Sequence, residues 1–309
     1  MIEPVFSVVI PVLNGAETIE EELDALAGQQ GVDFPWEVIV ADNGSTDATR
    51  DIVRARVEGF PAALRLVDAS AVRGAAFACN AGAVAAVGSS LAFCAADDRV
   101  GPRWVAAAHE ALQGAEAVGG PIRQLRTPHD PNAPILRYSI EHAIRGDCPV
   151  IVGTGNLAMR RDAFLRVGGL DFSMTRYGGE DNEFALRVMQ AGVRPAIRED
   201  VTLFFRSAPT LRTEIRKILG SAGAEVDIWR KHPDQFPFEN GRGWLLAVLR
   251  EYPGLMLHDL RNRNPRSAVR FTLRRLGNIR SKLTGRRRPL PPPRLIDQVE
   301  MPRDITKAP

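Results

Sequence analysis

The sequence predicts an α/β protein with a mostly parallel sheet flanked by helices, followed by a basic helical extension. Short apolar runs rich in β-branched residues alternate with helical patterns through the first hundred residues, an order typical of parallel sheets with crossover helices. Polar turn formers follow the main runs. Beyond Ser207 the strand patterns stop and helical periodicity continues, with Arg and Lys accumulating towards residue 288. These observations predict the sheet and the extension.

Four buried strands are expected in the first hundred residues. The first is broken by Asn14-Gly15, and the fourth stops at the adjacent carboxylates Asp97 and Asp98. The helices between them carry apolar residues at helical spacing, and the third helix consists mainly of small residues. The expected strands span 5–13, 37–41, 64–67 and 91–94, and the expected helices lie around 19–26, 52–57 and 74–87.

The pattern is less regular in the second hundred residues. Residues 123–149 are expected to be a Pro-rich connection with weak helix around 135–144. A helix opening at Glu180-Asp181 is expected to close at Gly192. The other expected elements are helices over 104–113 and 164–167 and short strands at 117–118 and 201–205.

Composition bounds the class of protein. The 309 residues are 45% hydrophobic, which is enough for one large core or two modest ones. No apolar run approaches the 18 residues of a membrane span, and the N-terminus resembles a first strand rather than a signal peptide. Cys79, Cys94 and Cys148 are odd in number and form no C-x-x-C pair. We therefore expect reduced thiols in a cytoplasmic protein.

Acidic side chains gather where strands or loops end. They form three groups: Asp42 with Asn43, Asp97 with Asp98, and Glu180 with Asp181. Carboxylates that converge on one sheet edge suit Mg²⁺ or Mn²⁺ holding a polyphosphate, and a remaining acid could act as a general base. The structural alternative is that the second and third groups only cap the helices that follow them.

Five motifs in order make a family resemblance. They are Ser7-Val8-Val9-Ile10-Pro11-Val12-Leu13-Asn14, Asp42-Asn43-Gly44-Ser45-Thr46-Asp47, Asn80-Ala81-Gly82, Asp97-Asp98 and Gly178-Gly179-Glu180-Asp181. Over residues 5–205 the chain resembles the family 2 glycosyltransferases of GT-A fold, which is Rossmann-like. The resemblance divides the first part of the chain into a nucleotide-sugar-binding half (1–100) and an acceptor and catalytic half (101–206). The residue pattern adds the basic helical extension (207–288) and a disordered Pro-rich tail (289–309).

The resemblance implies transfer of a sugar from a nucleoside-diphosphate sugar to an acceptor hydroxyl with inversion, in cell-envelope glycan or glycolipid synthesis. Asp181, beside Glu180, would match the general base, and Asp97 and Asp98 would meet a divalent cation. Gly155, Asn156 and Gly179 would lie on the acceptor side, with a saccharide or lipid-linked acceptor. The nucleotide sugar would be bound by Pro11, Asn14, Asp42, Asn43, Gly44, Asn80 and Asp97.

Three positions depart from the family pattern. Ala95 stands where an acid is expected, Cys79 where an Arg is frequent, and Phe204 near an expected metal-binding His. Alanine cannot hydrogen-bond a ribose and phenylalanine cannot ligate a metal. The alternative to an active enzyme is therefore a degenerate, non-catalytic nucleotide-binding protein of the same fold.

A second alternative, a dinucleotide-dependent oxidoreductase, rests on the formal G-x-G-x-x-A match at 153–158. That match lies in mid-chain, whereas such fingerprints follow the first strand, so this class is disfavoured.

The basic character of the chain belongs to one segment. Eleven Arg and Lys lie between Arg261 and Arg288 without an acid, and acidic residues outnumber basic ones in the rest of the chain. The segment suits either a solvated helix packed on the catalytic domain or a helix on an anionic membrane surface, at the inner face of the cell membrane. Nucleic acid is disfavoured because Phe271 is the only aromatic residue among these cations.

Overall fold

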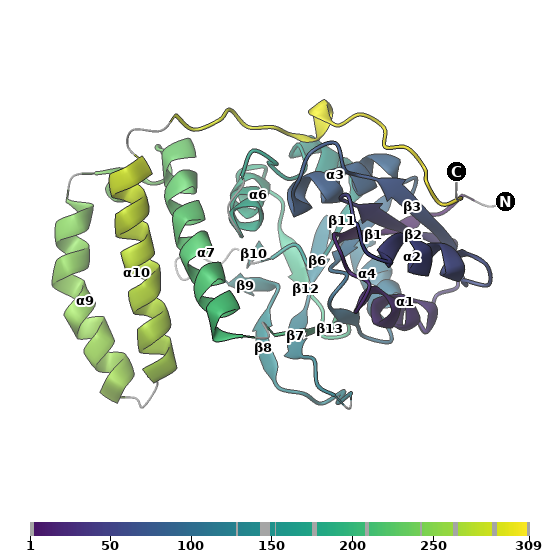
Figure 1. Ribbon diagram of the computed structural model, residues 1–309, viewed down its shortest axis with the longest axis horizontal. Helices are drawn as coiled ribbons and strands as arrows, with labels where there is room; N and C mark the ends of the chain where they lie inside the picture. Colours follow the sequence, from purple (N-terminus) through teal and green to yellow (C-terminus); the bar gives the residue numbers. More distant parts are fainter. Residues whose placement is uncertain are drawn as a thin grey trace. The chain divides into compact units, whose positions relative to one another are not determined.

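The computed structural model describes residues 3–127, 129–142, 149–151, 153–174, 178–207, 210–241, 243–261, 265–285 and 289–307 (Figure 1). The chain divides into two compact units. The α/β unit comprises Met1–Phe172, Glu183–Ser207 and Arg294–Pro309, and the helical unit comprises Ser173–Asn182 and Ala208–Pro293. The two expected halves, 1–100 and 101–206, thus fall largely in one unit.

A seven-stranded sheet forms the centre of the α/β unit, in the order β12-β6-β11-β4-β1-β2-β3. All neighbouring strands run parallel except β11, which is antiparallel to both β4 and β6. The mostly parallel α/β fold is thereby confirmed. The strands are β1 (Phe6–Val12), β2 (Trp36–Asp42), β3 (Ala63–Asp68), β4 (Ser90–Cys94), β6 (Ala117–Gly119), β11 (Asn156–Arg160) and β12 (Pro195–Ile197).

Helices cover both faces of this sheet because alternate strand residues point to opposite sides. Val8 joins one apolar cluster and Val9 the other, and both are fully buried. The cluster of Val8 includes residues of α1 (Ile19–Ala27), α2 (Thr49–Val57) and α4 (Trp104–Leu112). The cluster of Val9 includes residues of α3 (Ala75–Ala85), α5 (Arg161–Arg166) and α6 (Gly179–Gln190).

Two small sheets replace the helix expected around 135–144. Strands β8 (Ile135–Tyr138) and β9 (Ile140–His142) pair with β7 (Pro121–Gln124) and β10 (Pro149–Ile151). Long-range pairing therefore overrides a weak local helical pattern, and residues 143–148 lie outside the described part of the chain. The larger of these sheets has the order β5-β13-β7-β8, with β5 at Arg99–Val100 and β13 at Leu203–Phe205.

The C-terminal tail is ordered where the structure describes it, so the expected disorder of 289–309 is corrected. After the short 3-10 helix η1 (Ile296–Gln298), the tail runs to the outer edge of β3. Asp304 forms an antiparallel bridge with Val67, and the Ile305 amide donates to a β3 carbonyl oxygen at 2.8 Å. Figure 1 shows this yellow segment ending beside β3. The tail thus covers the exposed edge of the sheet.

The helical unit has a small core of its own. Val226, Trp229 and Trp244 are buried together. A Cβ on Gly277 would lie 2.7 Å from Ala222 Cβ, so this glycine permits close packing of two helices. No described helix meets the length and hydropathy of a membrane span. The helices are α7 (Leu211–Lys231), α8 (Pro237–Asn240), α9 (Trp244–Arg261) and α10 (Pro265–Gly285).

Candidate functional site

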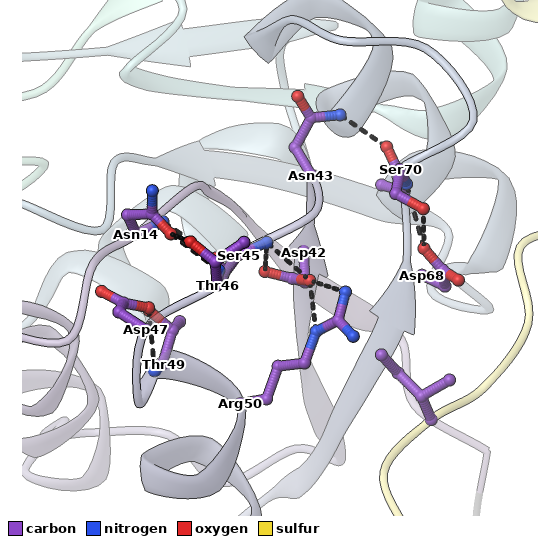
Figure 2. Close-up of polar contacts among 12 residues, drawn as sticks. Asn14, Asp42, Asn43, Ser45, Thr46, Asp47, Thr49, Arg50, Asp68 and Ser70 are labelled. Atoms are coloured by element: carbon purple, nitrogen blue, oxygen red, sulfur yellow. Dashed lines mark hydrogen bonds and ion pairs between the residues drawn. The ribbon is translucent and has the colours of Figure 1, made fainter.

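The turns after β1 and β2 lock together at the carboxyl edge of the sheet (Figure 2). Asn14 adopts a left-handed conformation (φ 53°), which Asn tolerates better than most residues. Its amide N–H donates to Ser45 Oγ at 2.9 Å, and its Oδ1 accepts the Thr46 N–H at 2.8 Å. Asn14 is therefore a structural link between the two loops that the resemblance assigns to the nucleotide.

Asp42 lies at the centre of this cluster and is completely buried. Its carboxylate accepts the Ser45 N–H at 3.1 Å and the Arg50 Nε–H at 2.6 Å. Arg50 comes from α2 and keeps a third of its side chain exposed. A ligand approaching Asp42 thus meets the Arg50 guanidinium, a residue that sequence reasoning missed. The sequence did contain a signal for this contact, because Arg50 lies in the first turn of the helix that follows the acid at the end of β2.

Asn43 holds the loop between β3 and α3. Its Nδ2 donates to the carbonyl oxygens of Ala69 (2.5 Å) and Val72 (2.8 Å), and its Oδ1 accepts the Gly74 N–H at 2.7 Å. Gly44 next to it has a φ of +91°, which favours glycine. Both positions shape the cluster through the backbone.

Asn80 and Pro11 contribute structure rather than free polar groups. Asn80 is fully buried in α3, where its Nδ2 donates to the Leu170 carbonyl oxygen (2.8 Å) and its Oδ1 accepts the Leu170 N–H (2.9 Å). The predicted nucleotide contact of Asn80 therefore has no exposed atom in this structure. Pro11 pairs with Ala41 within the sheet and is half-buried.

A second cluster follows β4 and contains the predicted cation ligands. Asp97 is exposed, whereas Asp98 is 3% exposed and accepts the Arg206 N–H at 3.0 Å. Arg206 follows β13, and its Nε–H donates to the Asp97 carbonyl oxygen at 3.0 Å. Its Nη2 lies 2.5 Å from Glu21 Oε2 on α1. The structure thus places a guanidinium beside Asp97, which sequence reasoning did not foresee.

Phe204, at the position near which a metal-binding His was expected, is part of the packed interior. It is 3% exposed and packs edge-on against the His129 ring, with centroids 4.6 Å apart. Burial, together with the charge of Arg99, lowers the pKa of His129 and favours its neutral form.

The described residues bring no three His, Cys, Asp or Glu side chains together as metal ligands. Magnesium-type ions bind through one or two carboxylates together with substrate phosphates and water. Asp97 is exposed and could supply one carboxylate ligand, so phosphates and water would have to supply the others. Asp98 is buried and turned inward.

Glu22 lies beneath the second cluster and is another residue that sequence reasoning missed. It is fully buried on α1, and its Oε2 accepts the Val100 N–H at 3.0 Å. Burial raises its pKa well above the ordinary value of glutamate, and the charge of Asp98 acts in the same direction. The protonated form of Glu22 is thus favoured, and the side chain holds the strand that follows the Asp97–Asp98 turn.

The predicted acceptor side is divided between a buried residue and an open one. Asn156 is fully buried, its Oδ1 accepts the Trp104 Nε1–H at 2.7 Å, and its Nδ2 donates to the Val201 carbonyl oxygen at 3.0 Å. It therefore has a structural role here and exposes no atom to an acceptor. Gly155 differs, because a Cβ placed there would meet nothing within 4 Å.

Glu180 and Asp181 begin α6, and both belong to the helical unit. Burial and the neighbouring charge of Asp181 raise the pKa of Glu180 to about 7. Gly178 has a φ of +72°, and a Cβ on Gly179 would lie 2.9 Å from the Ala224 Cβ. These glycines are thus required by the turn and by helix packing, which explains them without a substrate.

A parallel sheet with polar clusters after β1, β2 and β4 defines the class of α/β proteins that bind ligands at the carboxyl edge. The family is established by sequence. The model described as "Glycosyl transferase family 2" matches residues 7–168, about half of the chain. A model described as "N-terminal domain of galactosyltransferase" matches residues 137–209. The chain belongs to glycosyl transferase family 2.

Known proteins agree with this assignment. Validoxylamine A glucosyltransferase of Streptomyces hygroscopicus subsp. jinggangensis is 29% identical over 267 residues, covering 76% of this chain and 62% of the relative. The chain thus spans about three fifths of that relative. Similar solved structures include the Pyrobaculum calidifontis mannosyltransferase PcManGT with GDP-Man and Mn²⁺, with a TM-score of 0.61, 22% identity and coverage of 90% of this chain and 88% of that one.

Staphylococcus aureus TarS with UDP-GlcNAc is also similar, with a TM-score of 0.52, 19% identity and coverage of 89% and 88%. These structural similarities confirm the GT-A fold.

Proposed function

We propose that the chain transfers a sugar from a nucleoside-diphosphate sugar to an acceptor hydroxyl, with inversion at the anomeric carbon. The observation that carries the proposal is the pair of polar clusters around Asp42 and Asp97 at one edge of the sheet of a family 2 protein. Loops from three strands form these clusters, as expected for a nucleotide site in an open α/β sheet. The non-catalytic alternative is not favoured, because the relatives are named as transferases.

In the proposed reaction Asp181 accepts the proton of the acceptor hydroxyl. The acceptor oxygen then bonds to the anomeric carbon as the bond from that carbon to the phosphate oxygen breaks, and the nucleoside diphosphate leaves with the electron pair. A divalent cation, Mg²⁺ or Mn²⁺, would be held by Asp97 and would supply positive charge to the leaving diphosphate. The loops at Asn14, Asp42 and Asn43 would position the nucleotide.

Calorimetric titration with UDP, GDP, dTDP and CDP, each with and without Mn²⁺, tests the donor site. We expect one of these nucleotides to bind, more tightly with Mn²⁺, because the cation and the diphosphate complete a ligand set that Asp97 alone cannot provide. Asp97→Asn should reduce the effect of Mn²⁺ and leave the thermal midpoint near that of wild type. If none of the four nucleotides binds, the site does not work as a donor site, and both the transferase proposal and the nucleotide-binding alternative fail.

We also propose that the acceptor is presented at an anionic membrane surface, as in cell-envelope glycan or glycolipid synthesis. Val269, Leu276 and Leu283 recur every seven residues on α10, so they share one helix face, and they are 57%, 57% and 61% exposed. Gly277 and Asn278 on the opposite face pack against α7. A basic helix with such an outward apolar stripe suits the headgroup region of a bilayer.

Sedimentation with vesicles tests the membrane proposal. The double variant Leu276→Glu, Leu283→Glu should lose binding to phosphatidylglycerol vesicles, because it puts charge into the apolar stripe. Val87→Glu, at a position on the α/β unit that is 55% exposed, is the matched control and should bind as wild type does. Wild-type protein that never sediments with anionic vesicles would remove the membrane partner.

A further inference from the structure

Arg206 is held in the α/β unit by one main-chain and one side-chain hydrogen bond to the turn at Asp97 and Asp98. The β5–β13 register pairs Leu203 with Val100 and, continued, sets Arg206 opposite Asp97. The Arg206 main-chain N–H is anchored on the Asp98 carboxylate, and the Nε–H on the Asp97 carbonyl oxygen, both at 3.0 Å. These two hydrogen bonds to one turn leave the Nη atoms on the outer edge of the guanidinium to bind another group.

The partner of that outer edge is replaceable. Arg206 Nη2 pairs with the Glu21 carboxylate at 2.5 Å, and the two side chains are 37% and 41% exposed. Exposed ion pairs of this kind contribute little to stability, because water and salt screen both charges. A diphosphate carries more negative charge than one carboxylate, and its oxygens match the planar fork of arginine. Exchange of Glu21 for a phosphate oxygen is therefore favourable.

Several carboxylates surround Arg206. Without the Arg206 guanidinium, this cluster would have an excess of negative charge. Ala95 supplies no ligand, Phe204 is buried against His129, and Asp98 is engaged with the Arg206 backbone. A cation held mainly by Asp97 would have few protein ligands and would have to neutralise most of the diphosphate charge alone. The arginine supplies a permanent charge at the same turn.

We propose that Arg206 binds the diphosphate of the donor, releasing Glu21 as it does so, and that it takes over part of the charge neutralisation that a fuller metal site would provide. This inference rests on the proposed donor site. It makes donor binding partly independent of the divalent cation.

The test compares nucleotide affinity in EDTA and in Mn²⁺ for wild type, Arg206→Gln, Arg206→Lys and Glu21→Gln. The probe is whichever nucleoside diphosphate binds wild type, together with its nucleoside lacking phosphates. We expect wild type to retain binding in EDTA and Arg206→Gln to lose about tenfold or more, which is the effect of one charge-assisted contact. Arg206→Lys should recover part of the affinity, and Glu21→Gln should bind more tightly than wild type.

Nucleoside affinity and the thermal midpoint serve as controls, and we expect both to be unchanged in all variants. Equal diphosphate affinity in wild type and Arg206→Gln would overturn the role of Arg206 while leaving the donor site intact. Absence of diphosphate binding in every protein, with or without Mn²⁺, would overturn the donor site and this inference together.

Discussion

Asp181→Asn is expected to reduce turnover by about 10²- to 10⁴-fold, the usual contribution of a general base. The amide is nearly the same size as the carboxylate, so it preserves packing at the start of α6, but it cannot accept the acceptor proton. Single-turnover rates at saturating donor and acceptor are the measurement, with nucleotide affinity and the thermal midpoint as checks of intact structure. Turnover equal to that of wild type would remove Asp181 from the mechanism.

Glu180→Gln is the matched control for that experiment and adds a pH test. Because burial and the charge of Asp181 raise the pKa of Glu180 to about 7, Glu180 loses its proton as the pH rises through that value. The new negative charge at the start of α6 attracts the proton that leaves the acceptor hydroxyl. Turnover of wild type should therefore rise with pH through about 7, and Glu180→Gln should lack this rise. A rise that persists in Glu180→Gln belongs to another group.

Asn156→Ala is expected to destabilise the α/β unit by about 3 kcal/mol or more, because it leaves several buried groups without hydrogen-bond partners. The Trp104 indole N–H loses its acceptor, and the Val201 carbonyl oxygen loses a donor. Urea unfolding monitored by circular dichroism measures the loss. The expected result would identify Asn156 as a structural residue at the start of β11.

Gly155→Ala is the matched variant at the neighbouring position. Its new methyl group meets no atom within 4 Å, so stability should stay within about 0.5 kcal/mol of wild type. If this loop borders the acceptor, the same change should raise the acceptor KM. A stable Asn156→Ala protein with a selective rise in acceptor KM would instead place Asn156 in the acceptor site.

The sheet could be predicted because its strands are buried on both faces and are therefore continuously apolar. The strands expected at 5–13, 37–41, 64–67 and 91–94 correspond to β1, β2, β3 and β4. No strand end differs from the expected one by more than one residue. The family could be recognised because its motifs occur in a fixed order along the chain, in β1, after β2 and β4, in α3 and at the start of α6, so local sequence carried both signals.

Other features depend on contacts that no local pattern contains. β8 gains its conformation by pairing with β7, and the tail by pairing with β3 more than 200 residues away. Arg206 is close to Asp97 only because the β5–β13 register places it there. Asn80 and Asn156 were expected to bind ligands because of their positions in the motifs. In the structure both side chains are buried and hydrogen-bond to main-chain carbonyl oxygens.

The tail that pairs with β3 also adjoins the cluster around Asp42, which we propose binds the nucleotide, and the proposal therefore links docking of the tail to nucleotide binding. The Arg303 carbonyl oxygen accepts the Asp68 N–H at 2.9 Å, and Asp68 is paired with Asp42 in the β2–β3 register. Docking of the tail and the proposed binding of a nucleotide thus act on two paired residues, Asp68 and Asp42. A nucleotide that prefers the docked form must, by reciprocity, hold the tail in place by the same factor by which the docked tail raises nucleotide affinity.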